Sequence, residues 1–459
     1  MVEQKFINRE WELKFLQEAY KSERNELIVV YGRRRVGKTV LALKSIENNK
    51  NAIYFFAEET TEEENRKTFR KLVADYLGDK ILEKADLGWE KIFATVAERA
   101  PGTVIVIDEF PNLIRGNRAI VSKFQKMWDS LNQSARIKLV LLGSSVSVME
   151  SEVLSYKSPL YGRRTGQIRL RPLNPIHLSE FFPEMSWEER VKIYGITDMI
   201  PAYLWEAKAR IGENKDIQAV FAPGTMLFEE AEFLLRYELR EPARYYEVLE
   251  AIAKGATKFG EICNETGFPA PVVSQYLSRL ELLGIVKKET PLLESPKRRN
   301  ARYKISDNYF RFWFRFIYPN RSIILREGRL QGFEEEYNKY MGSVFEGFWR
   351  EVLPEFLPGI QHAGKWWHKS EEIDVVATAE GNRVYALEVK WKDLTKADAR
   401  RLLAKLKKKV EKEPFRKHNV KTGVVGKHVD GKEEFRGEGF VVLDLSDLEV
   451  LGKRSSDRE

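Results

Sequence analysis

The sequence predicts an α/β protein that begins with a parallel sheet and continues through a helical segment, a winged helix-turn-helix and a second α/β domain. The first 170 residues alternate short β-branched runs with longer helical patterns. The middle of the chain has the plan of a winged helix, and the C-terminal part again mixes strands with a helix. Strands that alternate with helices favour a doubly wound sheet whose functional loops lie at the carboxyl ends of its strands.

The length and composition are typical of a chain with several folded domains. At roughly 150 residues per domain, 459 residues correspond to about three domains. Hydrophobic residues make up 43% and aromatic residues 12%, which excludes a disordered chain. The longest apolar runs are much shorter than the roughly 18 residues that a membrane span requires. A start without signal-peptide features and a single cysteine, Cys263, favour the cytoplasm.

A glycine-rich loop follows the first apolar run, residues 27–31. Residues 32–39 match the phosphate-loop pattern GxxxxGK[ST] and are followed by a helical pattern. The backbone N–H groups of such a loop cradle phosphates, Lys38 reaches the β- and γ-phosphates, and the Thr39 hydroxyl can hold Mg²⁺. The sequence therefore predicts a P-loop NTPase parallel sheet with ATP and Mg²⁺ as cofactors. The expected nucleotide-binding residues are Gly32, Arg33, Arg34, Arg35, Val36, Gly37, Lys38, Thr39 and Val40.

Two acidic residues end another apolar run, residues 104–107. A hydrolysing NTPase requires one carboxylate for its metal ion and another to polarise the attacking water. We assign these roles to Asp108, as a second metal ligand beside Thr39, and to Glu109, as the catalytic base. Ser144 ends the apolar run 138–143 and is expected beside the γ-phosphate.

These motifs resemble the AAA-type archaeal ATPase family, which is related to the signal-transduction ATPases, over roughly residues 1 to 240. Residues 6–10, Phe-Ile-Asn-Arg-Glu, resemble the family's opening segment, so the resemblance implies that Phe6, Ile7 and Arg9 border the adenine. Residues 159–163 resemble its arginine-bearing loop. Arg163 would then sense the γ-phosphate, in cis or in trans within a homo-oligomer. Taken without the resemblance, Arg163 belongs to a solvated loop pair.

One departure from the family pattern lies in the expected helical lid. Where these ATPases often carry a Gly-Gly pair ahead of a proline, this chain has Asp198 and Met199 ahead of Ile200 and Pro201. The lid is expected to begin after the sheet domain and to end before the winged helix. The predicted domains are 1–175 (P-loop ATPase core), 176–240 (helical lid), 241–310 (winged helix-turn-helix) and 311–459 (nuclease-like domain).

The winged helix is predicted from three short helical patterns, the last at about 270–283, and from two strands at 285–289 and 302–306. Residues 285–330 hold twelve Lys and Arg against four Asp and Glu, an excess that equals the net charge of +8 of the whole chain. This basic stretch predicts a nucleic-acid partner, in particular DNA. The recognition face would offer Ser274, Gln275, Ser278 and Arg279, and the wing Lys297, Arg298 and Arg299. Two alternatives are a solvated basic face and a winged helix used only for packing.

The C-terminal domain carries acids at strand spacing. Asp374 starts one apolar run, and Glu388 and Lys390 share one face of the next. Two such carboxylates can share Mg²⁺ while Lys390 orients a water that attacks a phosphodiester. This set resembles the PD-(D/E)xK nuclease core, which implies Asp374 and Glu388 as metal ligands, Glu346 as another and Lys390 as a catalytic residue. The alternative is a set of cross-strand ion pairs.

Two functions follow from these motifs. The first is an ATPase that binds DNA and couples its nucleotide state to a metal-dependent, nuclease-like domain. The second is an ATP-dependent switch without nuclease activity, whose C-terminal domain only binds nucleic acid or protein. The intact set of acids and lysine favours the first, because a binding module does not require it.

Overall fold

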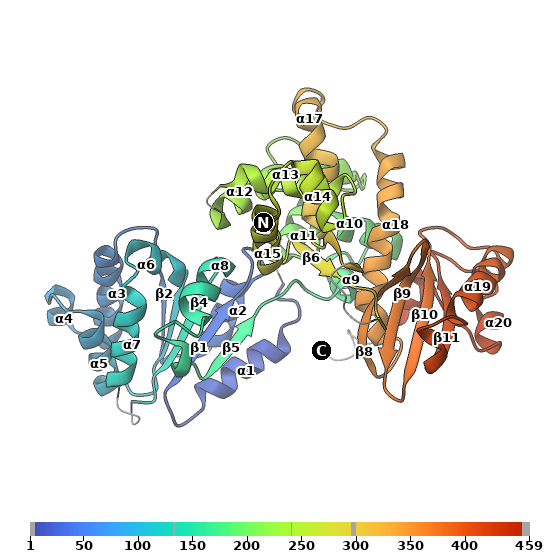
Figure 1. Cartoon of the computed structure of the whole chain (residues 1–459). Helices are drawn as coiled ribbons and strands as arrows, with labels where there is room; N and C mark the ends of the chain where they lie inside the picture. Colours follow the sequence, from blue (N-terminus) through green and yellow to red (C-terminus); the bar gives the residue numbers. More distant parts are fainter. Residues whose placement is uncertain (1–4, 132–134, 240, 295–299, 452–459) are drawn as a thin grey trace. The chain divides into compact units, whose positions relative to one another are not determined.

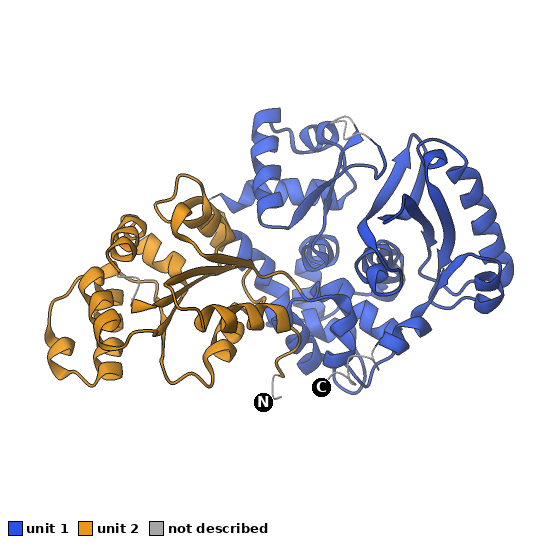
Figure 2. Cartoon of the chain, turned by 90° about the horizontal axis from the view of Figure 1, so that it is seen from below, with its two compact units in different colours: residues 1–2, 173–236, 241–459 blue, residues 3–172, 237–240 orange. Residues whose placement is uncertain are grey.

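The computed structural model describes residues 5–131, 135–239, 241–294 and 300–451, and the chain forms two compact units (Figure 1, Figure 2). Unit 2 comprises residues 3–172 and 237–240, and unit 1 comprises residues 1–2, 173–236 and 241–459. The four predicted domains divide the chain more finely, and their boundaries stay a prediction. Within the described ranges, no helix is both long and apolar enough to cross a membrane.

Unit 2 is built on a parallel five-stranded sheet in the order β2-β3-β4-β1-β5. Three of its strands are buried along their whole length, as expected of parallel strands with helices on both faces. Strands β1, β3 and β4 agree with the apolar runs 27–31, 104–107 and 138–143 to within one residue at each end. The strands are β1 (Glu26–Tyr31), β2 (Ala52–Phe56), β3 (Val104–Asp108), β4 (Lys138–Gly143) and β5 (Gly166–Arg169).

Aromatic side chains form the core between one face of this sheet and its helices. The rings of Phe69 and Trp89 lie 5.2 Å apart, and those of Trp89 and Phe124 lie 5.3 Å apart. This packing fixes the strand ends from which the functional loops leave. The helices are α1 (Glu10–Tyr20), α2 (Lys38–Ile46), α3 (Glu62–Leu77), α4 (Lys80–Lys84), α5 (Trp89–Arg99), α6 (Phe110–Gly116), α7 (Ile120–Ser130) and α8 (Val146–Val148).

Unit 1 opens with the helical segment that the sequence predicts. Its helices are α9 (Leu178–Phe181), α10 (Trp187–Thr197), α11 (Pro201–Ile211) and α12 (Met226–Glu238), whose last two residues group with unit 2. Asp198 and Met199 both have left-handed backbone angles, with φ of 51° and 55°. Glycine adopts these angles without strain, which gives a physical reason for the family's Gly-Gly pair. Asp198 also accepts a hydrogen bond from the Asn308 amide at 3.0 Å.

The winged helix follows within unit 1 and agrees with the predicted ranges to within one residue. It consists of α13 (Pro242–Ala253), α14 (Phe259–Thr266), α15 (Ala270–Leu282) and the antiparallel strands β6 (Val286–Glu289) and β7 (Arg302–Ile305). The predicted wing residues Lys297, Arg298 and Arg299 lie outside the described residues. The predicted helix-turn-helix arrangement is confirmed.

The C-terminal part of unit 1 is an α/β domain with a mixed sheet in the order β12-β11-β10-β9-β8. Its α/β class agrees with the prediction, and its nuclease-like character stays a prediction. The long helix α18 packs on β8, β9 and β10. The elements are α16 (Asn308–Phe312), α17 (Arg321–Glu327), α18 (Phe333–Val352), β8 (Ile360–His368), β9 (Glu371–Ala379), β10 (Arg383–Val389), α19 (Lys396–Val410), β11 (Asn419–Val425), α20 (Lys432–Gly437) and β12 (Val441–Leu443).

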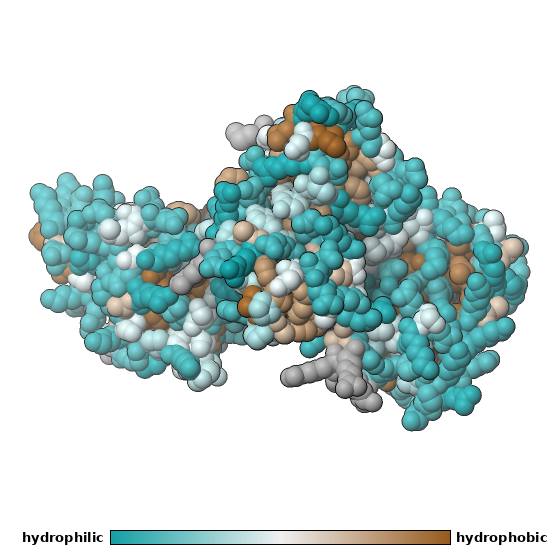
Figure 3. Space-filling view, turned by 45° about the horizontal axis from the view of Figure 1, so that its top comes forward, coloured by the Kyte–Doolittle hydropathy of each residue, from teal (hydrophilic) through white to brown (hydrophobic). Residues whose placement is uncertain are grey.

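The surface visible in Figure 3 is largely hydrophilic, with smaller apolar areas. This distribution agrees with a charged-residue content of 32%. The exposed apolar side chains include Ile323 and Leu325 of α17. Scattered apolar side chains of this kind are normal on folded domains.

A candidate nucleotide-binding and hydrolysis site

The phosphate loop connects β1 to α2 in unit 2. A Cβ atom at Gly32 would lie 2.3 Å from the Leu170 carbonyl oxygen, so only glycine fits this approach of two backbones. Gly37 has a φ of 96° and directly precedes the helix. The two glycines therefore allow the loop to turn and present the N-terminus of α2, where unpaired N–H groups favour an anion.

Lys38 is buried at the start of α2. Its ammonium donates hydrogen bonds of 3.0 Å to the carbonyl oxygens of Gly32 and Arg33. Burial lowers the pKa of Lys38 to about 8, although the carboxylates of Glu109 and Asp108 favour its charged form. The lysine thus lies folded over its own loop, in position to exchange carbonyl partners for phosphate oxygens.

The predicted magnesium ligands are in direct contact. The Thr39 hydroxyl donates a 2.6 Å hydrogen bond to the Asp108 carboxylate, which is fully buried at the end of β3. Tyr54 of β2 donates to the same carboxylate oxygen at 2.8 Å. Burial raises the pKa of Tyr54, and its bond to Asp108 raises it further. A hydroxyl and a carboxylate oxygen are hard ligands of the kind that Mg²⁺ prefers.

Glu109 and Ser144 are the second predicted pair that the structure brings together. Glu109 has a left-handed φ of 55°, and such angles are uncommon for residues other than glycine. The Ser144 hydroxyl donates to its carboxylate at 2.7 Å and the Ser144 amide donates at 3.3 Å. The strand ends of β3 and β4 therefore place the predicted base and the predicted γ-phosphate contact side by side.

The opening segment is fastened to the phosphate loop through Arg9. This buried guanidinium donates to the Val36 carbonyl at 3.4 Å and to the Arg171 carbonyl, and it pairs with Glu12 at 3.0 Å. Ile7 is buried and Phe6 is half-buried. The predicted adenine-bordering residues Phe6, Ile7 and Arg9 thus lie on a segment that is held to the loop.

Arg163 is not held at the phosphate loop. Its guanidinium forms a two-pronged pair with Asp129, at 2.6 and 2.8 Å, and donates to the Pro159 carbonyl at 2.9 Å. The side chain keeps 30% of its surface exposed. The role expected for Arg163 at the γ-phosphate, in cis or in trans, stays a prediction.

Sequence reasoning missed three residues of this site. The Tyr237 ring lies under the guanidinium groups of Arg115, at 4.3 Å, and Arg34, at 5.3 Å, and its hydroxyl is 3.2 Å from the Ser144 hydroxyl. Glu238 accepts from the Ser147 hydroxyl at 2.8 Å. Tyr54 is the third. The one sequence signal for Tyr54 is its position on β2, two residues before Phe56. Phe56 pairs with Asp108 of the neighbouring strand β3.

The C-terminal acids lie where strand pairing predicts. Lys390 donates to Asp374 at 2.7 Å and lies 3.2 Å from Glu388. Burial raises the pKa of Asp374, but Lys390 and the Val389 amide outweigh it, so the pKa is lowered overall. Lys390, which directly follows β10, thus contacts both predicted metal ligands, Asp374 of β9 and Glu388 of β10.

Lysines neutralise all three C-terminal carboxylates. Glu388 pairs with Lys409 at 2.6 Å, and Glu346 of α18 pairs with Lys365 at 2.8 Å. Burial raises the pKa of Glu346 despite Lys365, and the Asp374 charge raises it further. Among the described residues, no three His, Cys, Asp or Glu side chains are arranged to hold a metal ion. Carboxylates have the right chemistry for Mg²⁺, but the predicted set of three is not assembled as ligands here.

The comparisons with known proteins agree with the geometry of the first site. Residues 6–207 match the model of an ATPase domain found predominantly in Archaea. The chain is 40% identical over 454 residues to the uncharacterized protein MJECL04 of Methanocaldococcus jannaschii, covering 96% of this chain and all of that protein. The chain belongs to the family of MJECL04. Its N-terminal part is an archaeal ATPase domain, as the sequence predicts.

Two further family models match segments of unit 1 of this chain. Residues 246–288 match bacterial regulatory proteins of the arsR family, and residues 313–402 match archaeal and bacterial proteins of unknown function. The Walker-type ATPase PABY2304 of Pyrococcus abyssi covers 68% of this chain and 96% of its own, at 24% identity and a TM-score of 0.53. This likeness shows a shared fold.

Proposed function

We propose that the MJECL04-family chain hydrolyses ATP at the site formed by the phosphate loop and the ends of β3 and β4. The supporting observation is the convergence of Lys38 with two contacting pairs, Thr39 with Asp108 and Ser144 with Glu109. Lys38 neutralises the β- and γ-phosphates, and Thr39 and Asp108 hold Mg²⁺. Mg²⁺ bound there supplies charge stabilisation at the transferred phosphate. Glu109 orients the attacking water, and Ser144 holds Glu109 in place.

Phosphate release from ATP in the presence of Mg²⁺ tests this proposal. Lys38→Ala is expected to abolish turnover, because the lysine charge stabilises the transferred phosphate. Lys44→Ala is the matched control, because Lys44 lies on the same helix and its side chain is 42% exposed. Among the described residues, its ion-pair partner is Glu47. Turnover at the wild-type rate in Lys38→Ala would contradict the proposed site.

We further propose that the winged helix binds DNA. Ser274, Gln275 and Ser278 of α15 are exposed and Arg279 is half-buried, so the predicted recognition face is open to a ligand. Lys287 and Lys288 of β6 are also exposed. Such a face reads DNA through polar side chains and holds its backbone through basic ones.

The packing alternative has support of its own. Leu292, which follows β6, donates its amide to the Lys365 carbonyl at 2.8 Å, and Arg302 of β7 lies 4.7 Å from the Trp367 ring. These contacts occupy the strand side of the winged helix against β8. They leave the α15 face open, so packing and DNA binding use different sides of the same module.

Fluorescence anisotropy with a DNA duplex at increasing salt tests the DNA proposal. Lys287→Ala combined with Lys288→Ala is expected to weaken binding and to reduce the slope of log K against log salt by up to about two, because fewer counterions are released. Lys254→Ala is the control, since this exposed residue of the same module pairs with Glu250 at 2.9 Å. An unchanged slope in the double variant would contradict a role of β6 in DNA binding.

A second candidate function is metal-dependent cleavage of DNA by the C-terminal domain, coupled to the nucleotide state. The contacts of Lys390 with both Asp374 and Glu388 favour it. Asp374 and Glu388 would hold Mg²⁺, with Glu346 as a further ligand. Lys390 would orient the attacking water. The competing function is an ATP-dependent switch that does not cleave, which the three lysine-neutralised carboxylates favour.

A cleavage assay separates these two functions. Asp374→Asn is expected to abolish Mg²⁺- or Mn²⁺-dependent cutting of linear and circular DNA without changing ATP hydrolysis. Asp398→Asn is the control, because Asp398 lies on α19 and pairs with Lys392. If wild-type protein cuts no DNA form with or without ATP, the non-cleaving switch is the function of this domain.

A further inference from the structure

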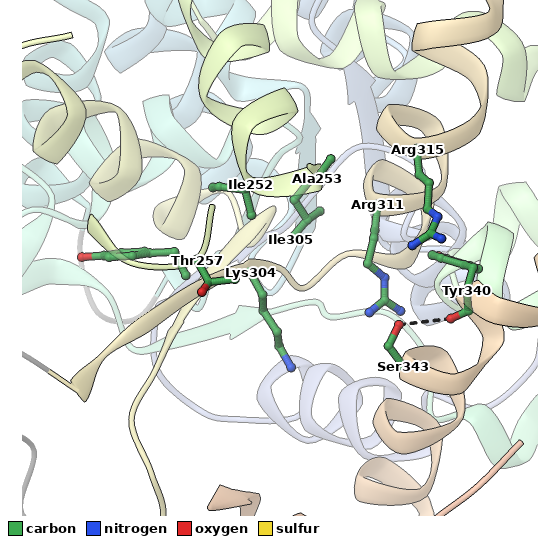
Figure 4. A pocket seen from close by; sticks show the side chains of 10 residues that line it. Ile252, Ala253, Thr257, Lys304, Ile305, Arg311, Arg315, Tyr340 and Ser343 are labelled. Carbon is green, nitrogen blue, oxygen red and sulfur yellow. Dashed lines mark hydrogen bonds between the residues drawn. The ribbon is translucent and has the colours of Figure 1, made fainter. Parts of the chain in front are cut away.

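A cavity of about 110 Å³ lies in unit 1 between the winged helix and helix α18 (Figure 4). Its walls come from α13, β7, the segment after β7 and α18, which are far apart in the sequence. The lining residues are Ile252, Ala253, Thr257, Tyr303, Lys304, Ile305, Arg311, Arg315, Tyr340 and Ser343. Three of these side chains are cationic and none is acidic.

In this cavity Arg311 has a hydrogen-bond donor without a partner among the described residues. One of its Nη atoms donates to Asn308 at 2.6 Å, and its guanidinium lies 5.1 Å from the centre of the Tyr340 ring. Its Nε atom is buried and has no hydrogen-bond partner. A buried donor without a partner lowers the stability of the folded protein. Figure 4 shows the Arg311 guanidinium directed toward the Ser343 hydroxyl.

Acidic neighbours compensate the three cations only in part. Glu289 of β6 pairs with Lys304 at 2.6 Å, but it also pairs with Arg350 of α18 at 3.3 Å. Burial lowers the pKa of Lys304 to about 8, and the charges of Arg350 and Arg311 add to this effect against Glu289. Glu289 therefore shares its charge between Lys304 and Arg350 and does not pair with Lys304 alone.

Arg315 and Arg311 have weaker or more distant counter-charges. Glu336 lies 3.8 Å from Arg315, beyond ordinary hydrogen-bond distance. The Asp198 carboxylate, which accepts from the Asn308 amide, acts on Arg311 through its charge. An anion in the cavity would meet three cationic groups, each with donors that a second partner can use.

We propose that this cavity binds one phosphate group, as inorganic phosphate or as the terminal phosphoryl group of a small metabolite. Lys304, Arg311 and Arg315 supply its charge-assisted hydrogen bonds, which are the strong ones for such ligands. The Thr257 hydroxyl is a further donor on the wall, whereas the Ser343 hydroxyl already donates to the Tyr340 carbonyl at 3.1 Å. A phosphate has enough acceptor oxygens to use donors from three sides, and the small volume excludes a whole nucleotide.

This cavity belongs to unit 1, whereas the phosphate loop belongs to unit 2. A ligand bound in the cavity would therefore have a different effect from a nucleotide bound at the loop. The walls of the cavity join the winged helix to α18, the helix that carries Glu346 of the C-terminal domain. A bound phosphate would bridge the cations of β7 and of residues 311–315. The ligand therefore stabilises the packing of the winged helix on the C-terminal domain.

Equilibrium dialysis with labelled inorganic phosphate tests the proposal on the full chain. Every protein in the comparison carries Lys38→Ala and the ionic strength is constant, so phosphate binding at the loop contributes equally. Lys304→Met is expected to weaken phosphate binding by about tenfold or more, the usual worth of a hydrogen bond to a charged group. Lys254→Met, an exposed lysine of the same module, is expected to change nothing.

Arg315→Gln provides an independent variant that is safe for folding, because the side chain is 42% exposed. It is expected to weaken phosphate binding as Lys304→Met does, with an unchanged circular dichroism spectrum. Equal phosphate affinity in Lys304→Met, Arg315→Gln and Lys254→Met would overturn the proposal. Weakening in the first two alone supports it.

Competition identifies the source of the phosphate group. Displacement of labelled phosphate by glycerol 3-phosphate supports a small phosphorylated ligand, and binding of inorganic phosphate without such displacement supports the free ion. If a DNA duplex displaces labelled phosphate and glycerol 3-phosphate does not, the cavity contacts the DNA backbone, and the proposed small-ligand site is overturned.

Discussion

The Thr39 hydroxyl lies 2.6 Å from the Asp108 carboxylate although the two residues are 69 positions apart in the chain. Parallel pairing of β3 and β4, and of β4 and β1, brings their carboxyl ends to one edge of the sheet. The helix that begins at Lys38 starts at this edge. The hydrogen bond therefore marks the place where Thr39 and Asp108 would hold Mg²⁺ in the proposed site, and exchange of this contact for the ion is the expected first effect of MgATP.

Removal of either partner of this contact is expected to raise the Mg²⁺ concentration required for ATP hydrolysis. Asp108→Asn replaces a charged ligand by a neutral one, so we expect a half-saturating Mg²⁺ concentration about tenfold or more above that of wild type. Tyr54→Phe removes the other hydrogen bond to Asp108 and should change this value much less. ATP turnover measured across a Mg²⁺ titration checks this, and equal values for Asp108→Asn and Tyr54→Phe would contradict the assignment of Asp108.

The pH dependence of ATP binding follows from Lys38. Its pKa of about 8 in the free protein is set by burial, with Glu109, Asp108 and Glu238 opposing the shift and Arg34 adding to it. Phosphates favour the charged ammonium, so ATP binding raises this pKa and takes up a proton above pH 8. The affinity for ATP is therefore at its maximum below pH 8 and falls by at most about tenfold per pH unit above pH 8.

Titration of binding between pH 7 and 9.5 measures this effect. Lys38→Arg keeps its charge throughout this range, so its ATP affinity should be nearly independent of pH. If wild type and Lys38→Arg have the same pH dependence, another group is responsible.

Arg163 is expected to act across a subunit interface rather than within its own subunit. Within its own subunit its guanidinium is held by a two-pronged pair with Asp129. Arg163→Ala and Lys38→Ala should each be inactive alone, and their mixture should regain part of the ATPase activity, because a shared site combines one intact loop with one intact arginine. An active Arg163→Ala protein, or a mixture that stays inactive, contradicts this role.

Replacement of two glycines of the C-terminal domain by alanine is expected to have opposite effects on the free energy of unfolding. A Cβ atom at Gly423 of β11 would lie 2.0 Å from the Val441 carbonyl oxygen of β12, so Gly423→Ala should destabilise by about 1–3 kcal/mol. Gly342 of α18 has open space around it, and Gly342→Ala should stabilise by about 0.5–1 kcal/mol through helix propensity. Urea unfolding curves check both, and a stabilising Gly423→Ala would contradict the packing of these strands.

The sheet and the phosphate loop could be predicted because their signals are local. Strands buried on both faces are continuous apolar runs, as in residues 138–143, and the loop has fixed residue types at fixed spacing. Asp108 and Glu109 follow directly from the end of such a run. The placement of Asp374 beside Glu388 could also be predicted, because the two runs form an antiparallel pair.

The remaining parts of both sites depend on contacts between distant residues. Tyr237 reaches Ser144 across 93 positions, and Lys409 reaches Glu388 across 21, without any local pattern. The lysines that neutralise the C-terminal acids therefore could not be predicted. Nor could the cationic cavity, because Lys304, Arg311 and Tyr340 lie on different elements and only tertiary packing brings them together.

The most direct test of the central claim is a single-turnover experiment with Glu109→Gln. This change keeps Lys38, Thr39 and Asp108, so the variant should bind MgATP with wild-type affinity. It lacks the carboxylate that polarises the attacking water, so bound ATP should remain uncleaved, with a rate of hydrolysis reduced by about 10²-fold or more. Retention of intact ATP on the protein is the predicted result. Hydrolysis of bound ATP at the wild-type rate would contradict the account.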